Sequence, residues 1–184
     1  KLAAVGMKVA LSGRTLKTVE KAAEYLGDAS NVLALESDVT NLSSEKAAIE
    51  KIISTWGQLD VVLANAGVGH FAAIDEMSEA QWHSMIDTNL NGVFHTLKAS
   101  VEALKKSKGY YMTLASLAGT NFFASGAGYN ATKFGVVGFT QAVMLDLRKY
   151  DIKVSTIMPG SVATHFNGNE PDEKDAWKIQ PEDI

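Results

Sequence analysis

The chain has 184 residues, of which 46% are hydrophobic and 21% charged, a composition typical of a globular domain with a sizeable core. Its formal net charge is −4 and its lysines and arginines are scattered, which argues against a nucleic-acid interface. It contains no cysteine, which excludes disulfides and thiolate metal sites, and it shows neither a membrane-length apolar run nor a signal peptide, so we expect a cytoplasmic protein.

Apolar runs rich in β-formers alternate with helical periodicity along the chain. In order, the pattern predicts a strand at 7–12, a helix at 15–26 stopped by Gly27, a strand at 31–39, a helix from Ser43 or Ser44 to Thr55, and a strand at 59–67. It continues with a helix from the capping box of Ser78 and Gln81 to 106, a strand at 109–116, a helix at 129–150 and a strand at 151–160. This alternation predicts an α/β fold with a Rossmann-like, doubly wound parallel sheet in three α/β/α layers.

The two ends of the chain have the character of helix ends. Residues 1–6 resemble the last turns of a helix that stops at Gly6, and residues 180–184 resemble a first helical turn with Pro181 at its first position. We therefore expect a single domain over 1–184 that continues beyond both ends. The polar, irregular stretch at 164–184 is expected to form a substrate loop or lid.

One glycine-rich stretch imitates a dinucleotide fingerprint. Residues 67–72, GVGHFA, match G-x-G-x-x-G/A after a predicted strand, and an acid, Asp87, follows further on. The pattern must open a helix directly, whereas the helix is predicted to begin at Ser78, and Asp87 falls inside that helix. We interpret the stretch as a turn at the carboxyl edge of a strand, where ligands of open α/β sheets bind.

A set of chemistry-bearing residues follows a fixed order. YNATK at 129–133 places Tyr129 and Lys133 on one helical face, and Ser116 precedes the tyrosine by thirteen residues. ANAG at 64–67 and DTNLNG at 87–92 lie upstream, and MPGSVAT at 158–164 lies downstream. Together these motifs resemble the short-chain dehydrogenase/reductase family, classical type with the YxxxK motif, over essentially the whole chain. The resemblance implies an NAD(P)-dependent oxidoreductase that acts on small-molecule carbonyl or alcohol substrates.

The catalytic residues that the resemblance implies are Ser116, Tyr129, Lys133 and Asn89. Reduction of a carbonyl needs a hydride on carbon and a proton on oxygen, and a free tyrosine has a pKa near about 10, which is high for that task. A cation one helical turn away favours phenolate, so Lys133 is predicted to lower the pKa of Tyr129. Ser116 is expected to hydrogen-bond the substrate oxygen, and Asn89 is expected, from the resemblance, to hold a relay water.

Each of these residues also fits a plainer role. Ser116 is suited to ending a strand and starting a turn, Asn89 to a buried helix position bonded to backbone, and the tyrosine–lysine pair to a solvated face. For the chain as a whole, the alternative is a non-catalytic NAD(P)-binding sensor or regulatory protein on the same fold.

The cofactor preference is predicted from the end of the strand at 7–12. This strand ends in Ser-Gly-Arg, without the acid that NAD enzymes of this fold place there. The guanidinium of Arg14 suits a phosphate, so NADP(H) is predicted in preference to NAD(H), which stays possible; a solvated turn arginine is the alternative. The resemblance further implies cofactor contacts by Asp38, Val39, Asn65, Ala66, Gly67, Tyr129, Lys133, Pro159, Gly160, Val162 and Thr164.

Part of the family pattern lies outside this sequence. The Gly-rich turn TGxxxGxG and the strand before it are not found, and neither is the family's last strand. In the family that first strand lies between those built from 7–12 and 60–64, so its absence predicts a divided sheet and leaves the pyrophosphate site unassigned. We expect these residues to belong to a longer chain, because a central gap exposes two unpaired edges; an inactive chain is the alternative.

The remaining expectations concern partners and specificity. The helices at 78–106 and 129–150 resemble those that pair across family interfaces, so a homodimer or homotetramer is expected. Specificity is expected from the loop at 117–128, with Phe122 and Phe123, and from the lid at 164–180, whose apolar residues favour a hydrophobic substrate. No metal site is predicted, because no metal-ligand spacing connects His70, His83, His95 and His165.

Overall fold

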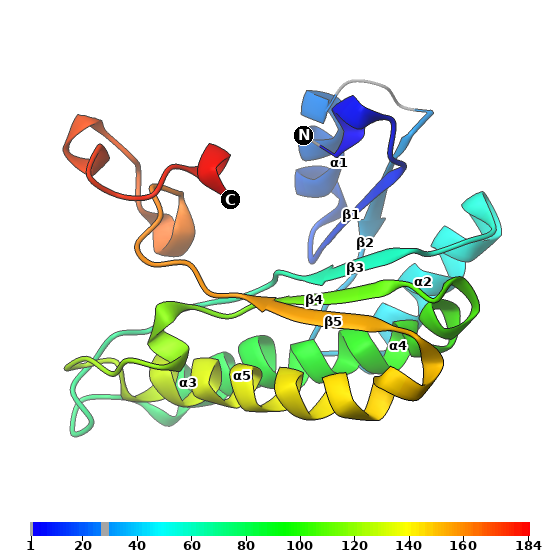
Figure 1. Cartoon of the computed structure of the whole chain (residues 1–184). Coiled ribbons are helices and arrows are strands. Elements are labelled where there is room, and N and C mark those ends of the chain that lie inside the picture. Colours follow the sequence, from blue (N-terminus) through cyan, green and yellow to red (C-terminus); the bar gives the residue numbers. More distant parts are fainter. Residues whose placement is uncertain (1, 27–29) are drawn as a thin grey trace.

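The computed structural model describes residues 2–26 and 30–184, so the predicted helix stop at Gly27 lies outside the described residues. Two strands, β1 (Val9–Gly13) and β2 (Val32–Glu36), pair in parallel. A second sheet places β4 (Tyr110–Leu114) between β3 (Val61–Ala64) and β5 (Lys153–Ile157), all parallel. The predicted Rossmann-like α/β fold is confirmed, and within the described ranges its sheet is divided between β1 and β3 as expected (Figure 1).

The helices lie on both sides of these strands. Figure 1 shows α1 (Leu16–Leu26) above the strands, and α3 (Glu79–Met85), α4 (Gly92–Ser107) and α5 (Ala127–Leu147) below the three-stranded sheet. The remaining helix, α2 (Leu42–Trp56), packs against α4 and β2. None of the helices in the described part of the chain is both long and apolar enough to cross a membrane.

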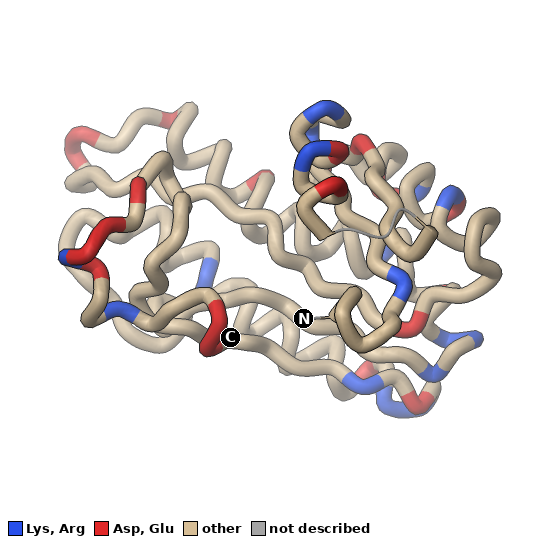
Figure 2. Tube along the Cα trace, turned by 90° about the horizontal axis from the view of Figure 1, so that it is seen from above, with Lys and Arg blue, Asp and Glu red and all other residues tan. Residues whose placement is uncertain are grey.

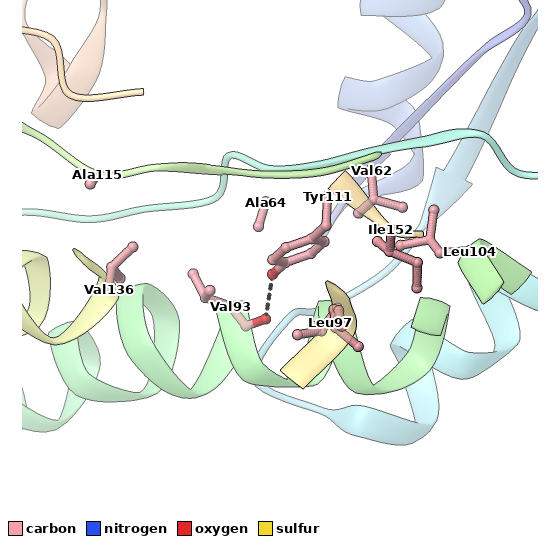
Figure 3. Packing of buried hydrophobic residues seen from close by; sticks show 10 residues of the cluster. Val62, Ala64, Val93, Leu97, Leu104, Tyr111, Ala115, Val136 and Ile152 are labelled. Carbon is pink, nitrogen blue, oxygen red and sulfur yellow. Dashed lines mark hydrogen bonds between the residues drawn. The ribbon is translucent and has the colours of Figure 1, made fainter. Parts of the chain in front are cut away.

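The main core lies between the three-stranded sheet and the helices below it. Tyr111 in the middle of β4 is fully buried, and its hydroxyl donates a 2.7 Å hydrogen bond to the Val93 carbonyl of α4 (Figure 3). Burial of each large apolar side chain in such a core contributes about 1.5–3 kcal/mol. The core is built from Val62, Ala64, Val93, Leu97, Leu104, Tyr111, Ala115, Val136, Leu147 and Ile152. This packing fixes β4, and with it the segment that follows at Ser116.

The caps of two helices were predicted from local sequence patterns, one correctly and one wrongly. The capping box is confirmed: the Ser78 side chain accepts from the Gln81 amide at 3.2 Å, and the Ser78 amide donates to the Gln81 side chain at 2.9 Å. The predicted cap of the preceding helix at Ser43 or Ser44 is wrong. Asn41 caps α2, because its side-chain oxygen accepts from the amides of both serines.

The helix predicted as continuous from residue 78 to 106 contains a wider turn. A π-helical segment, Ile86–Asn91, separates α3 from α4. Such segments insert extra residues into a helix and change which side chains face the core. The one-helix prediction is therefore wrong at this point, and the interruption falls on the segment that carries Asn89.

Short helical turns occur at both ends of the described chain. Gly6 ends the turn Ala3–Val5 in a left-handed conformation, with φ of 85°, as the stop signal predicted. Pro181 opens the turn Pro181–Asp183, also as predicted. Between Thr164 and this last turn, the lid forms two more short turns, Phe166–Gly168 and Glu173–Asp175, and returns through a parallel bridge between Val162 and Ile179.

Candidate active site

The candidate residues follow the carboxyl ends of the strands. Arg14 follows β1, Asp38 follows β2, the turn at 65–67 follows β3, Ser116 follows β4 and Pro159 follows β5. Because the strands are parallel within each sheet, the ends of β1 and β2 meet at one edge of the first sheet, and the ends of β3, β4 and β5 meet at one edge of the second. Ligands of open α/β folds bind at such edges.

Tyr129 and Lys133 lie on α5 with the helical spacing that the sequence predicted. The Lys133 side chain is buried, and its Nζ donates a 2.8 Å hydrogen bond to the Leu114 carbonyl at the end of β4. The same Nζ lies 5.6 Å from the centre of the Tyr129 ring. The ammonium is thus held between the tyrosine and the sheet instead of lying on a solvated face.

Burial controls the acid–base properties of this pair. It raises the pKa of Tyr129, and a hydrogen bond with the Ser116 hydroxyl opposes the rise. Burial also lowers the pKa of the Lys133 ammonium to about 8. The predicted net lowering of the Tyr129 pKa is wrong for this arrangement, because desolvation of the phenol outweighs the other influences on it. At neutral pH the phenol therefore keeps its proton.

Ser116 has the plainer role that its position suggested, and it also lies beside Tyr129. Its side-chain oxygen accepts a 3.1 Å hydrogen bond from the Ala118 amide and caps the short turn Leu117–Gly119. It also reaches the phenol of Tyr129. A strand-ending serine is therefore held next to the tyrosine by the local structure of its own loop.

Asn89 is almost completely buried, and three hydrogen bonds hold its side chain. Its Oδ1 accepts from the Val68 amide at 2.8 Å, and its Nδ2 donates to the Val68 carbonyl at 2.8 Å and to the Thr132 hydroxyl at 3.1 Å. The side chain thus links the turn after β3 to α5, which is the plainer role that the sequence allowed. A part in a proton relay stays a prediction.

The glycine turn after β3 lies beside this cluster. A Cβ added to Gly67 would come within 3.5 Å of the Asn89 Oδ1 and 3.9 Å of the Lys133 Nζ. The rejection of 67–72 as a dinucleotide fingerprint is confirmed, because the next helix begins only at Glu79 and Asp87 lies in the π-helical segment. The backbone of this turn, and not the N-terminus of a helix, therefore lies next to Lys133.

A second cluster forms where β1 and β2 end. Asp38 accepts 2.9 Å hydrogen bonds from the Thr40 amide and hydroxyl. The Thr40 amide is the main cause that lowers the pKa of Asp38, and the charge of the exposed Arg14 adds to it. Val39 packs against Gly92, and its carbonyl lies 2.8 Å from the His95 Nδ1. Arg14, Asp38 and Val39 are thus brought together, but apart from the residues around Tyr129.

The segment after β5 is braced by the lid. The Pro159 carbonyl accepts from the Leu117 amide at 2.9 Å, which ties it to the loop after Ser116. The Ala163 amide donates to the Ile179 carbonyl at 2.9 Å, and the Ile179 amide donates to the Ser161 carbonyl at 3.0 Å. Gly160, Val162 and Thr164 therefore lie on a strip of backbone held on both sides.

Several residues of the site were missed by the sequence reading. Thr132 and Asn130 lie inside YNATK, both buried: Thr132 contacts Asn89, and Asn130 donates to the carbonyls of Ala118 and Asn121 in the loop after β4. Their polarity on a helix face that packs inward was the available signal. Phe71 and Phe166 were also missed; their rings lie 5.4 Å and 6.2 Å from the ring of Tyr129.

The described residues contain no group of three or more histidines, cysteines or acids placed to hold a metal ion. Among the histidines, His95 places its Nδ1 2.8 Å from the Val39 carbonyl. Of the two loop phenylalanines predicted to face a substrate, Phe123 packs on Phe71 with a centroid distance of 5.9 Å, whereas Phe122 is 86% exposed.

The sequence of this chain is similar to those of known short chain dehydrogenases and oxidoreductases. The family model of short chain dehydrogenases matches residues 1–175. An uncharacterized oxidoreductase of Staphylococcus aureus is 34% identical over 182 residues, which cover 97% of this chain and 77% of that protein. An uncharacterized oxidoreductase of Schizosaccharomyces pombe is 33% identical over 151 residues, which cover 82% of this chain and 64% of that protein. The match thus spans less than two thirds of the length of the yeast relative.

Solved structures with the same fold include an alcohol dehydrogenase from the archaeon Thermococcus sibiricus, complexed with 5-hydroxy-NADP. It is 32% identical, with a TM-score of 0.91 over 98% of this chain and 77% of that chain. A short chain dehydrogenase/reductase from Burkholderia phymatum, in complex with NAD, is 26% identical, with a TM-score of 0.84 over 89% of this chain and 60% of that chain. These two proteins are thus complexed with different nicotinamide dinucleotides.

Proposed function

The chain belongs to the short chain dehydrogenase family, and from this membership we propose that it is an oxidoreductase that transfers a hydride between NADP(H) and a carbonyl or alcohol substrate. The observation that carries the proposal is the cluster at the end of β4. There, a half-buried phenol lies beside a serine hydroxyl that lowers the pKa of the phenol, and the centre of its ring lies 5.6 Å from a buried ammonium. Such a set is suited to moving a proton to or from a substrate oxygen.

The carboxyl edge of the strands fits a nicotinamide dinucleotide. Gly67 leaves its backbone open beside Lys133, and the exposed Arg14 offers a guanidinium for a 2′-phosphate. When bound, the cofactor supplies or accepts the hydride. The residues proposed to hold it are Arg14, Asp38 and Val39 at the adenosine end, Asn65, Ala66 and Gly67 in the middle, and Tyr129, Lys133, Pro159, Gly160, Val162 and Thr164 at the nicotinamide end.

The chain's own residues would handle the proton. The Ser116 hydroxyl donates a hydrogen bond to the substrate oxygen as negative charge develops there. Tyr129, whose raised pKa keeps it protonated at neutral pH, donates its phenolic proton to that oxygen. Lys133, with a pKa of about 8, still carries its charge at pH 7 and stabilises the phenolate that remains. In the oxidative direction the same phenolate accepts the proton. Asn89 supports the relay by holding the turn beside Lys133.

The substitution Tyr129→Phe tests the proton-transfer role. Reductase kcat should fall by about 100- to 10,000-fold, the usual contribution of a positioned acid, because the ring stays but the proton donor is lost. The Kd for NADPH, measured by fluorescence titration, should change little. Tyr25→Phe removes the same hydroxyl from a 91% exposed position on α1 and should keep full activity. A wild-type protein that binds NADPH but reduces nothing in a panel of carbonyl compounds would instead support a non-catalytic, cofactor-sensing role.

The preference for NADP(H) rests on Arg14. Comparison of kcat/KM for NADPH and NADH should favour NADPH, and Arg14→Ala should reduce that preference by about 10- to 100-fold, the value of a charge-assisted hydrogen-bonded pair. The variant should leave kcat/KM for NADH nearly unchanged, because NADH lacks the 2′-phosphate. A wild-type preference for NADH contradicts this assignment.

Assembly into a homodimer or homotetramer is proposed to use α4 and α5. Large apolar side chains are exposed on these helices, among them Phe94 and Leu145. A cavity of about 190 Å³ between the two helices is also lined mainly by apolar side chains, including Phe94 and Phe139. Burial of this surface in a second copy would remove it from water. Sedimentation equilibrium should show a mass that Phe94→Glu reduces to that of one chain.

A further inference from the structure

Three exposed phenylalanines surround the candidate proton donor, and we infer from them the class of substrate. We name Phe71, Phe123 and Phe166 the aromatic wall. This inference rests on the proposed function: the substrate is an uncharged ketone or alcohol that carries an aromatic or similarly bulky, flat apolar group next to the reacting carbon.

The rings of the aromatic wall form a continuous series with Tyr129. Phe71 meets Tyr129 edge to face, with a centroid distance of 5.4 Å and an interplanar angle of 66°. Phe123 packs on Phe71 at 5.9 Å, and Phe166 packs on Tyr129 at 6.2 Å. These are the tilted and T-shaped arrangements that aromatic rings favour. A substrate whose oxygen meets the Tyr129 hydroxyl therefore has aromatic surface close to the rest of its structure.

The aromatic wall is assembled from three segments that lie far apart in the sequence. Phe71 comes from the turn after β3, Phe123 from the loop after β4, and Phe166 from the lid. The lid is fixed to the turn by a 3.0 Å hydrogen bond from the Gly69 amide to the Asn167 Oδ1. This hydrogen bond holds the segment that carries Phe166 next to the turn after β3, so the aromatic wall includes a residue of that segment.

Two glycines make room for these rings. A Cβ on Gly69 would lie 3.0 Å from Phe71 and 3.2 Å from Phe166, and a Cβ on Gly126 would lie 2.6 Å from Phe123. All three rings thus rest directly on backbone that has no side chain. Close packing of this sort restrains the rings, which lowers the entropy lost when a flat ligand packs against them.

The rings remain open although they are packed on one side. Phe71, Phe123 and Phe166 are 51%, 45% and 41% exposed, respectively. Exposed apolar side chains that cluster commonly mark a binding site. The cluster is continuous with the half-buried Tyr129, so the open faces of the rings border the proposed proton-transfer position.

The charges of the lid disfavour an anionic substrate. Acidic residues predominate on this segment, including Glu170, Asp172, Glu173 and Asp175 (Figure 2). Lys178 is paired with Asp175 at 2.6 Å, so its charge is already partly compensated. A carboxylate or phosphate on the substrate would approach a surface of like charge. An uncharged aryl ketone meets no such repulsion and gains the contact with the aromatic wall.

The test compares three ketones with the purified protein and NADPH: acetophenone, acetone and acetoacetate. The value of kcat/KM should be highest for acetophenone, by about 100-fold over acetone, because a phenyl ring buries a large apolar area against the wall. Phe71→Ala and Phe166→Ala should each lower kcat/KM for acetophenone by about 10-fold and change that for acetone by less than about 2-fold. The Kd for NADPH and the thermal midpoint serve as checks on folding and cofactor binding. Tyr25→Ala, which removes an exposed ring from α1, should leave kcat/KM unchanged for all three ketones.

The outcomes separate the two proposals. A protein that reduces acetone or acetoacetate as well as or better than acetophenone overturns the substrate inference and leaves the oxidoreductase proposal intact. Equal losses for acetophenone and acetone in Phe71→Ala and Phe166→Ala also overturn the inference, since the rings would then support the site without selecting its ligand. A protein that binds NADPH and reduces none of the ketones overturns both.

Discussion

The β3–β4–β5 half of the molecule and the β1–β2 half differ in how their strands are paired and how deeply their side chains are buried. In the first, β4 has a partner on each side, and Tyr111 and Thr113 are fully buried. In the second, each strand has one partner, and none of the side chains of β1 and β2 is fully buried, the most buried being Leu35 with 8% exposed. The residues proposed to transfer the proton lie on the first half, and Arg14 and Asp38, proposed to bind the adenosine end of the cofactor, lie on the second. The proposed proton-transfer site is therefore held more firmly than the proposed adenosine site.

A buried carboxylate joins the two halves. Glu45 on α2 is 5% exposed and accepts hydrogen bonds from the Ser37 hydroxyl, after β2, at 2.6 Å and from the Thr96 hydroxyl, on α4, at 2.7 Å. Hydrogen bonds to a charged acceptor are the strong kind in proteins. Together with the contact between His95 and the Val39 carbonyl, this carboxylate positions the β1–β2 half against α4. We call Glu45 and its two hydrogen bonds the joint.

The largest effect is expected from Asn89→Leu in the firmer half. The Val68 amide and carbonyl would lose their side-chain partner in a buried place, so the free energy of unfolding should fall by about 3 kcal/mol. Urea denaturation followed by circular dichroism measures this. Asn91→Leu is the matched control in the same π-helical segment; Asn91 is exposed and bonds only to Asp87 among the described residues, so its loss should stay below about 0.5 kcal/mol. Equal losses in the free energy of unfolding in both variants would contradict the prediction that the hydrogen bonds of Asn89 stabilise this half.

A second effect of similar size, dependent on pH, is expected from Lys133. Its pKa is about 8 in the folded chain against 10.5 for a free lysine, so the unfolded chain binds more protons between these values. The contribution of Lys133 to stability should therefore be unfavourable below pH 8 and improve by about 3 kcal/mol as pH rises toward 10.5. Unfolding measured from pH 7 to 10 should show this rise in the wild type relative to Lys133→Met. Lys51 is exposed, so Lys51→Met should keep the wild-type dependence of stability on pH. If the stability of Lys133→Met changed with pH in parallel with the wild type, burial would not be lowering the pKa of Lys133.

The smallest effect is expected at the joint. In Glu45→Gln the amide nitrogen is a donor and cannot accept from one of the two hydroxyls, so stability should fall by about 1–2 kcal/mol. Hydrogen exchange should show the loss of protection mainly in β1 and β2, while β4 keeps its protection. Glu50→Gln, an exposed change on the same helix, should alter neither half. A loss of protection spread evenly over both sheets would mean that the two halves unfold as one unit.

Local signals allowed the strands, most helix ends and the Tyr129–Lys133 spacing to be predicted, because each depends on neighbours in the sequence. The π-helical segment was not predictable, since hydrophobic spacing does not reveal where a helix takes an extra residue. The pKa of Tyr129 was predicted in the wrong direction because spacing reports a nearby charge but not the burial that outweighs it. The contacts of Phe71 with Phe123 and of Tyr129 with Phe166 join segments that only the tertiary structure brings together.

The π-helical segment also determines how the chain tolerates changes in length. A π-helical turn holds one residue more than an α-helical turn, so removal of one residue from 86–91 would let α3 and α4 join as one α-helix with almost no rotation between them. The inward residues of α4, such as Val93 and Leu97, would then keep their places in the core, whereas the contact of Asn89 with Val68 would be disturbed. A single-residue deletion in this segment should therefore damage the turn after β3 more than the packing of α4.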